Sequence, residues 1–540
     1  MANRKLFPSY RGPRLPNATT RNEAGGAAYE FEARHALAQY AATGCLNAVF
    51  YASADDQLAQ VLALCEAVDP EFIAQTALYS RRDGAMKDLP ALLCAVLSVR
   101  GPEFLEAIFD DVIDTGNMLR NFVQIVRSGV VGRKSLGSQP KRLVRRWLDR
   151  RQDEQLLRDT VGRRPSIVDV IKMVHPKPLT AARDALYGYL LNRDHDASVL
   201  PQLARDLEEY KGADDRRGVE MPDVPFRMLT SLDLAPWEWK AIARKAPWET
   251  TRLNLNTFLR HGVFEDRDLV KLIAERLRDR ESIRRARALP YQLMVAYQMV
   301  EPGMPDAIRE ALQEALDVAL ENVPRIDGQV FVFPDISQSM HSPITGHRRG
   351  ATTAVRCIDV AALVAAALLR TNPRTEVVAF EAQAVPVALN PRDSVLTNAN
   401  RLASLPCGGT NCSAPLRYLN EKRRSGDLVI YLSDNESWID SPHYGHWGGG
   451  ATHTMQEWSA FKARSPQARM ICVDVQPYGS TQAQERADII NVGGFSDRVF
   501  DLIGAVATGG AAKGYWVDRI QSVKISAAAR RLPAAGLGKT

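Results

Sequence analysis

Five oxygen-bearing side chains in the carboxyl-terminal half of the chain have the types and the order of a site for a hard cation. An apolar stretch, residues 330–333, runs into a segment in which one carboxylate and two hydroxyls alternate. A second apolar stretch, residues 427–432, leads to another carboxylate, and a glycine-containing loop between the two carries a threonine. Mg²⁺ prefers such oxygen ligands in octahedral geometry and keeps several waters. The candidate ligands are Asp335, Ser337, Ser339, Thr410 and Asp434.

The pattern Asp-x-Ser-x-Ser alone does not distinguish a metal site from an ordinary turn, because Asp and Ser also cap helices and form turns after strands. Convergence favours the metal site. In an open parallel sheet, ligands bind outside the carboxyl ends of the strands, so side chains that follow two neighbouring strands meet at one edge. Pro334 cannot donate a ladder hydrogen bond, so we expect the first strand to stop pairing there.

The five ligand types, in this order and on these elements, resemble the metal-ion-dependent adhesion site (MIDAS) of von Willebrand factor A domains. The resemblance implies one divalent cation, Mg²⁺ by preference, and we expect its open coordination position to accept a carboxylate from a protein partner. A single cation without a second metal or a positioned base is poorly equipped for hydrolysis. The sequence shows no Ser-His-Asp or Cys-His arrangement and no phosphate-binding glycine loop with its lysine. We therefore expect a binding protein and no enzyme.

The elements that must position these ligands alternate between strand and helix from residue 324 to 509. The expected strands are continuously apolar, which is typical of a sheet covered on both faces, so we predict a doubly wound α/β domain. The loop 438–452 follows Asp434 and contains His443 and His446, which we interpret as part of a mobile lid rather than as metal ligands. The expected strands cover residues 329–333, 375–380, 384–389, 427–432, 469–475 and 489–492, and the expected helices cover residues 354–369, 396–405, 413–424, 454–463 and 496–506.

Residues 30–323 have a helical period throughout. Apolar residues recur three and four positions apart, as at Ile308, Leu312 and Leu316, and proline or glycine breaks separate the segments. Consecutive amphipathic helices joined by short turns predict an α-helical repeat (HEAT-like) solenoid, with a helical bundle as the alternative. We expect residues 1–29 to be a polar amino-terminal arm and residues 510–540 to be a carboxyl-terminal tail with one short strand near 516–523.

Composition narrows the class of protein. A chain of 540 residues exceeds one ordinary hydrophobic core, so we expect several domains, and 45% hydrophobic with 24% charged residues is typical of a soluble globular protein. Seven cysteines without Cys-x-x-Cys spacing indicate neither a zinc site nor a disulfide framework, which fits a cytoplasmic protein. The start of the chain lacks an apolar signal-peptide core, and the longest apolar run, residues 360–369, is too short to span a bilayer.

Cations cluster within the helical part, although the net charge of +6 is modest. Residues 132–151 carry eight Lys or Arg against one Asp. A plain solvated face usually has interspersed carboxylates, so their absence favours phosphate binding, in which each neutralised phosphate releases counterions. A further basic run, residues 276–287, alternates Arg with Glu and Asp and predicts a salt-bridged exposed face instead. The candidate phosphate ligands in the first cluster are Arg133, Lys134, Lys141, Arg142, Arg145 and Arg146.

A second basic segment lies close by in the sequence. Lys172 and His175 are three residues apart and share one helix face, and Lys177 follows them. Trp147 and His175 could stack on unpaired bases, as aromatic side chains do in RNA-binding proteins. The position of His175 directly before Pro176 is equally explained by a helix end.

A helical array followed by an A-type domain with these metal ligands resembles the Ro autoantigen family, the TROVE-domain RNA-binding proteins, and in particular its bacterial branch. Three further motifs carry the resemblance: Asn22-Glu-Ala-Gly-Gly26, Met86-Lys-Asp-Leu-Pro90 and Lys172-Met-Val-His-Pro-Lys-Pro178. In that family the helices close into a ring joined by the A domain. Small structured non-coding Y RNAs bind the outer basic surface, and single-stranded 3′ ends of misfolded RNAs thread the central hole.

The resemblance therefore implies a monomeric protein of non-coding RNA quality control or decay, with Lys172 and His175 on the Y RNA surface. It also implies a partnership with polynucleotide phosphorylase, tethered through the RNA. A second class of function is also consistent with the residues: an A-domain protein–protein interaction or assembly module whose basic helices contact only acidic protein. A steep salt dependence of binding would favour RNA.

Overall fold

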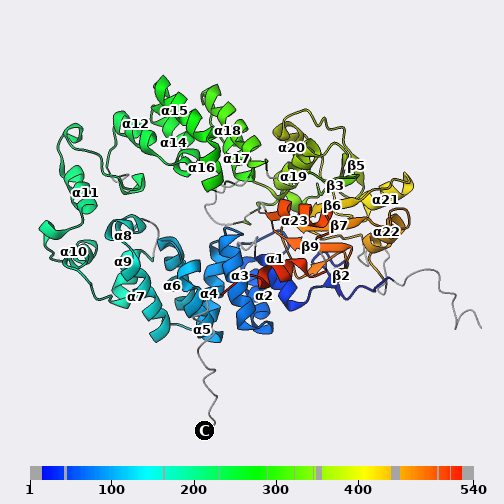
Figure 1. Cartoon of the computed structure of the whole chain (residues 1–540), viewed down its shortest axis with the longest axis horizontal. Coiled ribbons are helices and arrows are strands. Elements are labelled where there is room, and N and C mark those ends of the chain that lie inside the picture. Colours follow the sequence, from blue (N-terminus) through cyan, green and yellow to red (C-terminus); the bar gives the residue numbers. More distant parts are fainter. Residues whose placement is uncertain are drawn as a thin grey trace, which may run out of the picture. The chain divides into compact units, whose positions relative to one another are not determined.

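The computed structural model describes residues 15–41, 46–161, 165–229, 232–286, 288, 290–321, 323–344, 346–347, 355–439, 450–494, 498–510 and 513–525. The chain forms two compact units (Figure 1). One, here called the A-domain unit, comprises Met1–Gln39, Asn47–Ser53 and Val323–Val517, and the other, the helical unit, comprises Tyr40–Leu46, Ala54–Asn322 and Asp518–Thr540. No helix in the described parts of the chain is long and apolar enough to cross a membrane.

The A-domain unit is built on a six-stranded sheet of order β5-β4-β3-β6-β7-β9. All neighbouring strands pair in parallel except β5, which pairs antiparallel with β4 as a hairpin. The strands are β3 (Val330–Pro334), β4 (Thr375–Phe380), β5 (Ala384–Pro386), β6 (Leu428–Ser433), β7 (Arg469–Asp474) and β9 (Ile489–Gly493). The helices that follow them are α19 (Cys357–Thr371), α20 (Val395–Ala403), α21 (Ala414–Glu421), α22 (His453–Lys462) and α23 (Arg498–Ala507). The doubly wound α/β architecture predicted from the strand pattern is thus confirmed.

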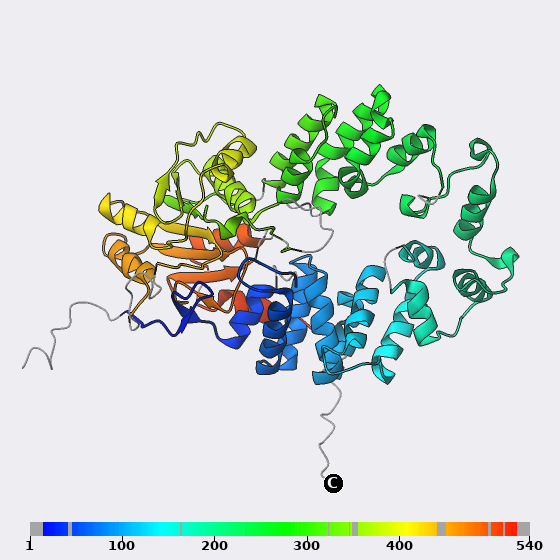
Figure 2. The same cartoon turned by 180° about the vertical axis from the view of Figure 1, so that it is seen from behind.

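Both faces of the sheet are buried, which explains why its strands are apolar at every position. Alternate residues of β3, β6 and β7, such as Phe331, Tyr431 and Met470, form a core with Trp458 of α22 and Leu416 of α21. The remaining strand residues face α19 and α23, which lie on the other side of the sheet (Figures 1 and 2). This double cover leaves the carboxyl edge of the parallel strands as the place where polar side chains can gather.

The expectation that pairing would stop at Pro334 is wrong. Pro334 is the last residue of β3 and lies opposite Leu432 in the parallel register with β6. The next residue restores the ladder, because the backbone N–H of Asp335 donates to the carbonyl of Leu432 at 3.0 Å. A proline in a strand removes one hydrogen-bond donor, its own backbone N–H. The ladder can continue past the proline when the next residue donates in its turn.

The two ends of the chain differ from the sequence-based expectation. Within the segment expected as an extended arm, β1 (Thr20–Arg21) pairs with β2 (Ala27–Glu30), which in turn pairs with β8 (Ser480–Thr481). The expected strand near residue 516 is the helix α24 (Tyr515–Gln521), where the Trp516 indole N–H donates to the carbonyl of Ala38 at 3.0 Å. Residues 1–14, the expected lid residues His443 and His446, and residues 526–540 lie outside the described parts.

The helical unit follows the predicted period. In α15 (Arg267–Arg278) and α18 (Asp306–Ala319), which pack against each other, Leu269, Ile273, Ile308 and Leu312 are fully buried. Asp69 caps the next helix by accepting a hydrogen bond from the Phe72 N–H at 2.9 Å, as expected for a carboxylate before Pro70. The helix α1 (Ala33–Tyr40) lies in the A-domain unit except for its last residue. The other helices of the helical unit are α2 (Ala54–Ala67), α3 (Pro70–Arg82), α4 (Asp88–Arg100), α5 (Pro102–Val112), α6 (Gly116–Ser128), α7 (Ser138–Arg150), α8 (Asp153–Asp159), α9 (Ile167–Val174), α10 (Ala181–Leu190), α11 (Gln202–Gly212), α12 (Pro236–Lys245), α13 (Trp248–Leu253), α14 (Leu255–Arg260), α16 (Arg280–Ala286) and α17 (Pro290–Gln298).

Candidate metal centre and candidate nucleic-acid interface

The candidate metal ligands lie at the carboxyl edge of the sheet. Asp335 directly follows β3, and its two carboxylate oxygens accept hydrogen bonds from the Ser433 hydroxyl at 2.6 Å and from the Ser337 N–H at 2.8 Å. The hydroxyls of Ser337 and Ser339 are 3.1 Å apart. Asp434 follows β6, the strand next to β3, and its charge acts on Asp335. The order of the strands thus brings these four side chains together, as the sequence predicts.

The fifth candidate ligand, Thr410, is held next to this cluster by backbone hydrogen bonds of the loop between α20 and α21. The Gln338 N–H donates to the carbonyl of Gly408 at 3.0 Å, and the Trp438 N–H donates to the carbonyl of Thr410 itself at 3.1 Å. Thr410 therefore lies between the segments that follow β3 and β6, and it is buried like the other four candidate ligands.

The electrostatics of this edge suit a cation. Burial raises the pKa of Asp335 to about 7, and the neighbouring negative charge of Asp434 adds to this rise, while hydrogen bonds from Ser337 and Ser433 oppose it. Burial also raises the pKa of Asp434, whose Oδ2 makes no hydrogen bond within the described residues. A buried carboxylate oxygen without a partner and two buried negative charges side by side are both costly. A divalent cation held by Asp335 and Asp434 would reduce their repulsion and give Asp434 Oδ2 a partner. The donor set therefore fits a hard cation such as Mg²⁺.

Two further acids lie close to these ligands. Burial raises the pKa values of Glu436 and Asp474 well above their usual range, and in both the charge of Asp434 adds to the effect. Among the described residues, no group of three or more His, Cys, Asp or Glu side chains is arranged to hold a metal ion. The candidate site is therefore of the two-carboxylate and hydroxyl type, with the outer acids around it.

The amino-terminal motif around Asn22 encloses the loop after Asp434. The Asn22 side chain donates to the carbonyl of Ser437 at 2.8 Å, and Glu436 accepts hydrogen bonds from the backbone N–H groups of Glu23 and Ala24 at 2.7 and 3.3 Å. A Cβ at Gly26 would lie 2.3 Å from the Ser437 carbonyl oxygen, so only glycine fits there. The motif thus supports the shape of the candidate metal edge.

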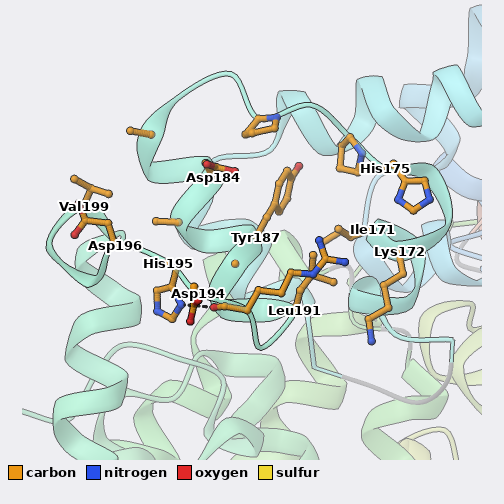
Figure 3. A pocket seen from close by; sticks show the side chains of 16 residues that line it. Ile171, Lys172, His175, Asp184, Tyr187, Leu191, Asp194, His195, Asp196 and Val199 are labelled. Carbon is orange, nitrogen blue, oxygen red and sulfur yellow. Dashed lines mark hydrogen bonds between the residues drawn. The ribbon is translucent and has the colours of Figure 1, made fainter.

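In the helical unit, Lys172 and His175 are exposed and line one hollow of about 480 Å³ between α9 and α10 (Figure 3). His175 also ends α9: it adopts a left-handed backbone conformation at φ 47°, and its N–H donates to the carbonyl of Ile171 at 3.0 Å. The interpretation of His175 as a helix end is therefore confirmed, and its ring is also exposed, while stacking on unpaired bases stays a prediction. Tyr187, Arg193 and His195 line the same hollow, together with Asp184, Asp194 and Asp196.

A second hollow of about 560 Å³ lies between α6, α7 and α9. Lys134 and Lys141, both predicted, line it together with Arg127, and its described lining contains no carboxylate. Met173, which neighbours Lys172 on α9, lines this hollow too, and its sulfur accepts from Arg127 at 3.4 Å. Residues of α9 thus line both hollows, and the lining residues of the two hollows together are here called the α9 surface.

The inference that the basic cluster has no carboxylates near it is wrong, because α5, which packs against α7, supplies two acids that are not part of the cluster's sequence. Glu106 of α5 pairs with Arg142 at 2.5 Å and with Arg146 at 2.6 Å. Asp110, one turn further along α5, pairs with Arg146 at 3.2 Å and also with Arg150. Burial raises the pKa of Glu106, but the bonds and charges of the two arginines outweigh it, and the net pKa is lowered. These arginines tie α7 to α5.

Of the remaining predicted cations, the two arginines donate to backbone carbonyls, and the lysine is exposed to solvent. Arg133 donates to the carbonyl of Leu136 at 3.1 Å, and Arg145 donates to the carbonyl of Val174 at 2.6 Å. Lys177 is exposed in the loop after α9. The basic run on α15 and α16 is salt-bridged as predicted, with its arginines paired mainly to acids of α18 and its end.

Trp147, expected as a stacking platform for bases, belongs to the core. It is buried, and its indole N–H donates to the carbonyl of Ile113 at 2.5 Å. The sequence analysis in turn missed Arg127, Arg193 and His195. They lie on other elements than the predicted clusters, and only the packing of α6, α9 and α10 brings them to the α9 surface.

Comparison with known proteins agrees with this architecture. Residues 329–507 match the family model described as the Ro60 von Willebrand factor A domain. The chain is 24% identical over 535 residues to RNA-binding protein RO60 of Deinococcus radiodurans, covering 92% of this chain and 96% of that protein. It is 23% identical over 257 residues to RNA-binding protein RO60 of Caenorhabditis elegans, covering 45% of this chain and 38% of that protein.

The fold is also that of a solved relative. The crystal structure of the Deinococcus radiodurans RO (RSR) protein superposes with a TM-score of 0.56 at 20% identity, over 89% of this chain and 100% of that chain. The bacterial relative is thus matched along both the helical unit and the A-domain unit. Residues 329–507 are thus a Ro60-type von Willebrand factor A domain, and the chain as a whole is similar in sequence and in fold to the Ro protein of Deinococcus radiodurans.

Proposed function

We propose that this protein binds RNA through the α9 surface. The observation that carries the proposal is the hollow lined by Arg127, Lys134 and Lys141 without a carboxylate in its described lining. Cations that have no acidic partner can exchange their counterions for phosphates, whereas arginines already paired to Glu106 gain little from a phosphate. The two RO60 relatives matched above are named RNA-binding proteins, which supports the same conclusion.

The RNA that suits this surface is small and structured, of the Y RNA class. Lys134 and Lys141 would hold backbone phosphates of the RNA. Lys172 and His175 would contact the part of the RNA that enters the other hollow, where the exposed His175 ring could stack on an unpaired base. Misfolded RNAs with single-stranded 3′ ends are the second class of ligand that we propose. The role would be quality control or decay of non-coding RNA in the cytoplasm, by a monomeric protein that meets polynucleotide phosphorylase through the bound RNA.

The A-domain edge would hold one divalent cation, Mg²⁺ by preference, through Asp335, Ser337, Ser339, Thr410 and Asp434. When bound, the ion would neutralise the buried carboxylates. The chain's own residues orient the site: Ser433 and the Ser337 N–H hold Asp335, and the Asn22 motif holds the loop after Asp434. We assign no catalytic step to this edge, and RNA binding by the α9 surface does not require it.

The test uses the full-length protein and a labelled RNA hairpin with a single-stranded 3′ tail, followed by fluorescence anisotropy. Lys172→Ala combined with His175→Ala should weaken binding, while Asp335→Ala should leave the affinity unchanged. Equal losses in both variants would contradict separate sites for RNA and metal. An absorbance excess at 260 nm in the purified protein, removed by ribonuclease, is a simpler check, and no binding of the hairpin at low salt would overturn the proposed function.

A further inference from the structure

A continuous series of buried hydrogen bonds runs from the candidate ligand Asp335 to helix α22 within the A-domain unit. Its first member is Ser433, the last residue of β6, whose hydroxyl donates to a carboxylate oxygen of Asp335 at 2.6 Å. The same hydroxyl oxygen accepts the backbone N–H of Asn435 at 2.9 Å. A serine hydroxyl has one hydrogen to donate and two lone pairs that accept. Because the Asn435 N–H occupies one of these directions, the hydroxyl hydrogen points away from it, toward Asp335.

Asn435 makes this contact from a backbone conformation that few residues adopt. Its φ is 60°, in the left-handed region, which residues other than glycine, asparagine and aspartate rarely enter. Its side chain is held from the other end, because Asn435 Oδ1 accepts a hydrogen bond from Gln482 Nε2 at 2.9 Å, across 47 residues of sequence. The contact with Gln482 therefore stabilises the conformation on which the hydrogen bond to Ser433 depends.

Gln482 is in turn held by α22 and by the residue that caps this helix. The Thr454 hydroxyl donates to Gln482 Oε1 at 2.9 Å, and the Thr452 hydroxyl donates to the Gln482 backbone carbonyl at 2.7 Å. Thr452 is the N-cap of α22, because its hydroxyl oxygen also accepts the Met455 N–H at 3.3 Å. Gln482 and both threonines are buried. Breaking any of these bonds would leave a polar group unsatisfied away from water, so together they hold the Gln482 amide in one orientation.

We propose that Gln482 is a positioning residue for the candidate metal site. It lies behind the ligands, and through Asn435 and Ser433 it fixes the direction in which the Asp335 carboxylate faces. Residues that hydrogen-bond to metal ligands orient them and thereby set the affinity of the site. This inference rests on the proposed metal site and is independent of RNA binding. No sequence pattern connects Gln482 with Asp335, since the series joins segments after β6 and before α22 to a third segment further along the chain.

The experiment titrates the full chain with Mn²⁺ alone and measures the free ion by electron paramagnetic resonance. Gln482→Met keeps the length of the side chain and removes both amide contacts. We expect it to weaken Mn²⁺ binding by about 10-fold, the lower end of the effect of residues behind metal ligands. Asn435→Gly, which tolerates the left-handed conformation but has no amide, should weaken binding to a similar extent. The double variant should bind about as tightly as the weaker single variant, because both changes break one series of bonds.

Thr481→Val is the matched control for a merely structural effect. The Thr481 hydroxyl donates to Asn491 Oδ1 at 2.9 Å, so this variant loses a buried hydrogen bond directly beside Gln482 and none in the series that leads to Asp335. It should lower the melting temperature of the metal-free protein, as Gln482→Met should, and yet bind Mn²⁺ like the unchanged protein.

Each outcome decides a different point. Equal Mn²⁺ affinity of Gln482→Met and the unchanged protein would overturn the positioning role and leave the metal site intact. A loss of affinity in Thr481→Val as large as in Gln482→Met, or fully additive losses in the double variant, would also overturn it. Failure of the unchanged protein to bind Mn²⁺ would overturn both the metal site and the role of Gln482. If Gln482→Met does not fold, the comparison of Asn435→Gly with Thr481→Val decides the question.

Discussion

Replacing Lys134 and Lys141 by alanine is the sharpest test of the α9 surface. Both side chains line the hollow that carries three cations and no carboxylate in its described lining, and neither takes part in an ion pair among the described residues. Their removal takes two potential phosphate contacts from the surface and leaves Lys172 and His175 in the other hollow beside α9. We expect the double variant Lys134→Ala, Lys141→Ala to fold normally, since neither side chain belongs to the buried core.

The expected magnitude follows from counterion release. The logarithm of the binding constant falls with the logarithm of salt concentration with a slope of about 0.7 per phosphate contact for single strands and about 0.9 for duplexes. Two lost contacts therefore reduce the slope by about 1.4 to 1.8. Taking about 1 M salt as the point where this contribution vanishes, the affinity at about 0.1 M salt should fall by about 25- to 60-fold.

The assay is fluorescence anisotropy of the labelled hairpin at several salt concentrations between about 50 and 200 mM. The matched control is Arg142→Ala combined with Arg146→Ala, which removes two arginines paired to Glu106. That variant should keep the salt slope and lose about 1 kcal/mol of stability or less per pair, because the pairs are partly exposed. A slope unchanged by the lysine substitutions, or lowered equally by the arginine substitutions, would refute the distinction between free and paired cations.

Three further outcomes are expected. In metal-free protein, ionisation of Asp335 opposes folding because its folded pKa of about 7 lies above the ordinary 3.8, so the melting temperature should fall as pH rises from about 4 to about 7. Mg²⁺ or Asp335→Asn should make that decline smaller, and the neighbouring buried acids Asp434, Glu436 and Asp474 account for what remains in the Asn variant. Gly26→Ala should cost about 1–3 kcal/mol in thermal unfolding because its Cβ meets the Ser437 carbonyl, whereas Gly450→Ala, with nothing within 4 Å, should be neutral. Trp147→Phe should cost about 1–3 kcal/mol by leaving a buried carbonyl unpaired, yet keep RNA affinity; a loss of affinity without loss of stability would restore the stacking role.

The candidate metal edge was largely predictable from the sequence because its ligands are local to strand ends. Each apolar stretch shows where a strand ends, and in a parallel sheet those ends share one edge, so Asp335 and Asp434 could be placed together without coordinates. The contact of the Asn22 motif with the loop after Asp434 was not predictable on the same grounds. Asn22 lies far from Asp434 in the sequence, and no periodicity marks it as a neighbour of Ser437.

For the basic cluster, the sequence-based prediction was only partly correct. A count of charges over residues 132–151 treats all cations alike, but helices of an array pack side by side. Glu106 precedes Arg142 and Arg146 by 36 and 40 residues in the sequence and still forms ion pairs with both of them. The arginines on the α5 side of α7 are neutralised by that neighbour, while Lys134 and Lys141 face a hollow where α6 and α9 supply only Arg127 and Met173. Ion pairs with an adjacent helix, which a count of charges within one segment does not include, therefore decide which cations are available to a polyanion.

The metal edge also explains why the amino-terminal motif has its composition. A loop that carries Asp434 and Glu436 into the interior is repelled by its own charges, so it needs donors that stay in place when no ion is bound. The N–H groups of Glu23 and Ala24 and the side-chain amide of Asn22 supply them. Glycine at position 26 allows the two backbones to approach closely enough. The motif thus holds the acidic loop by hydrogen bonds. A cation bound at the candidate ligands should therefore tighten this contact, and Mg²⁺ should slow amide exchange in residues 22–26.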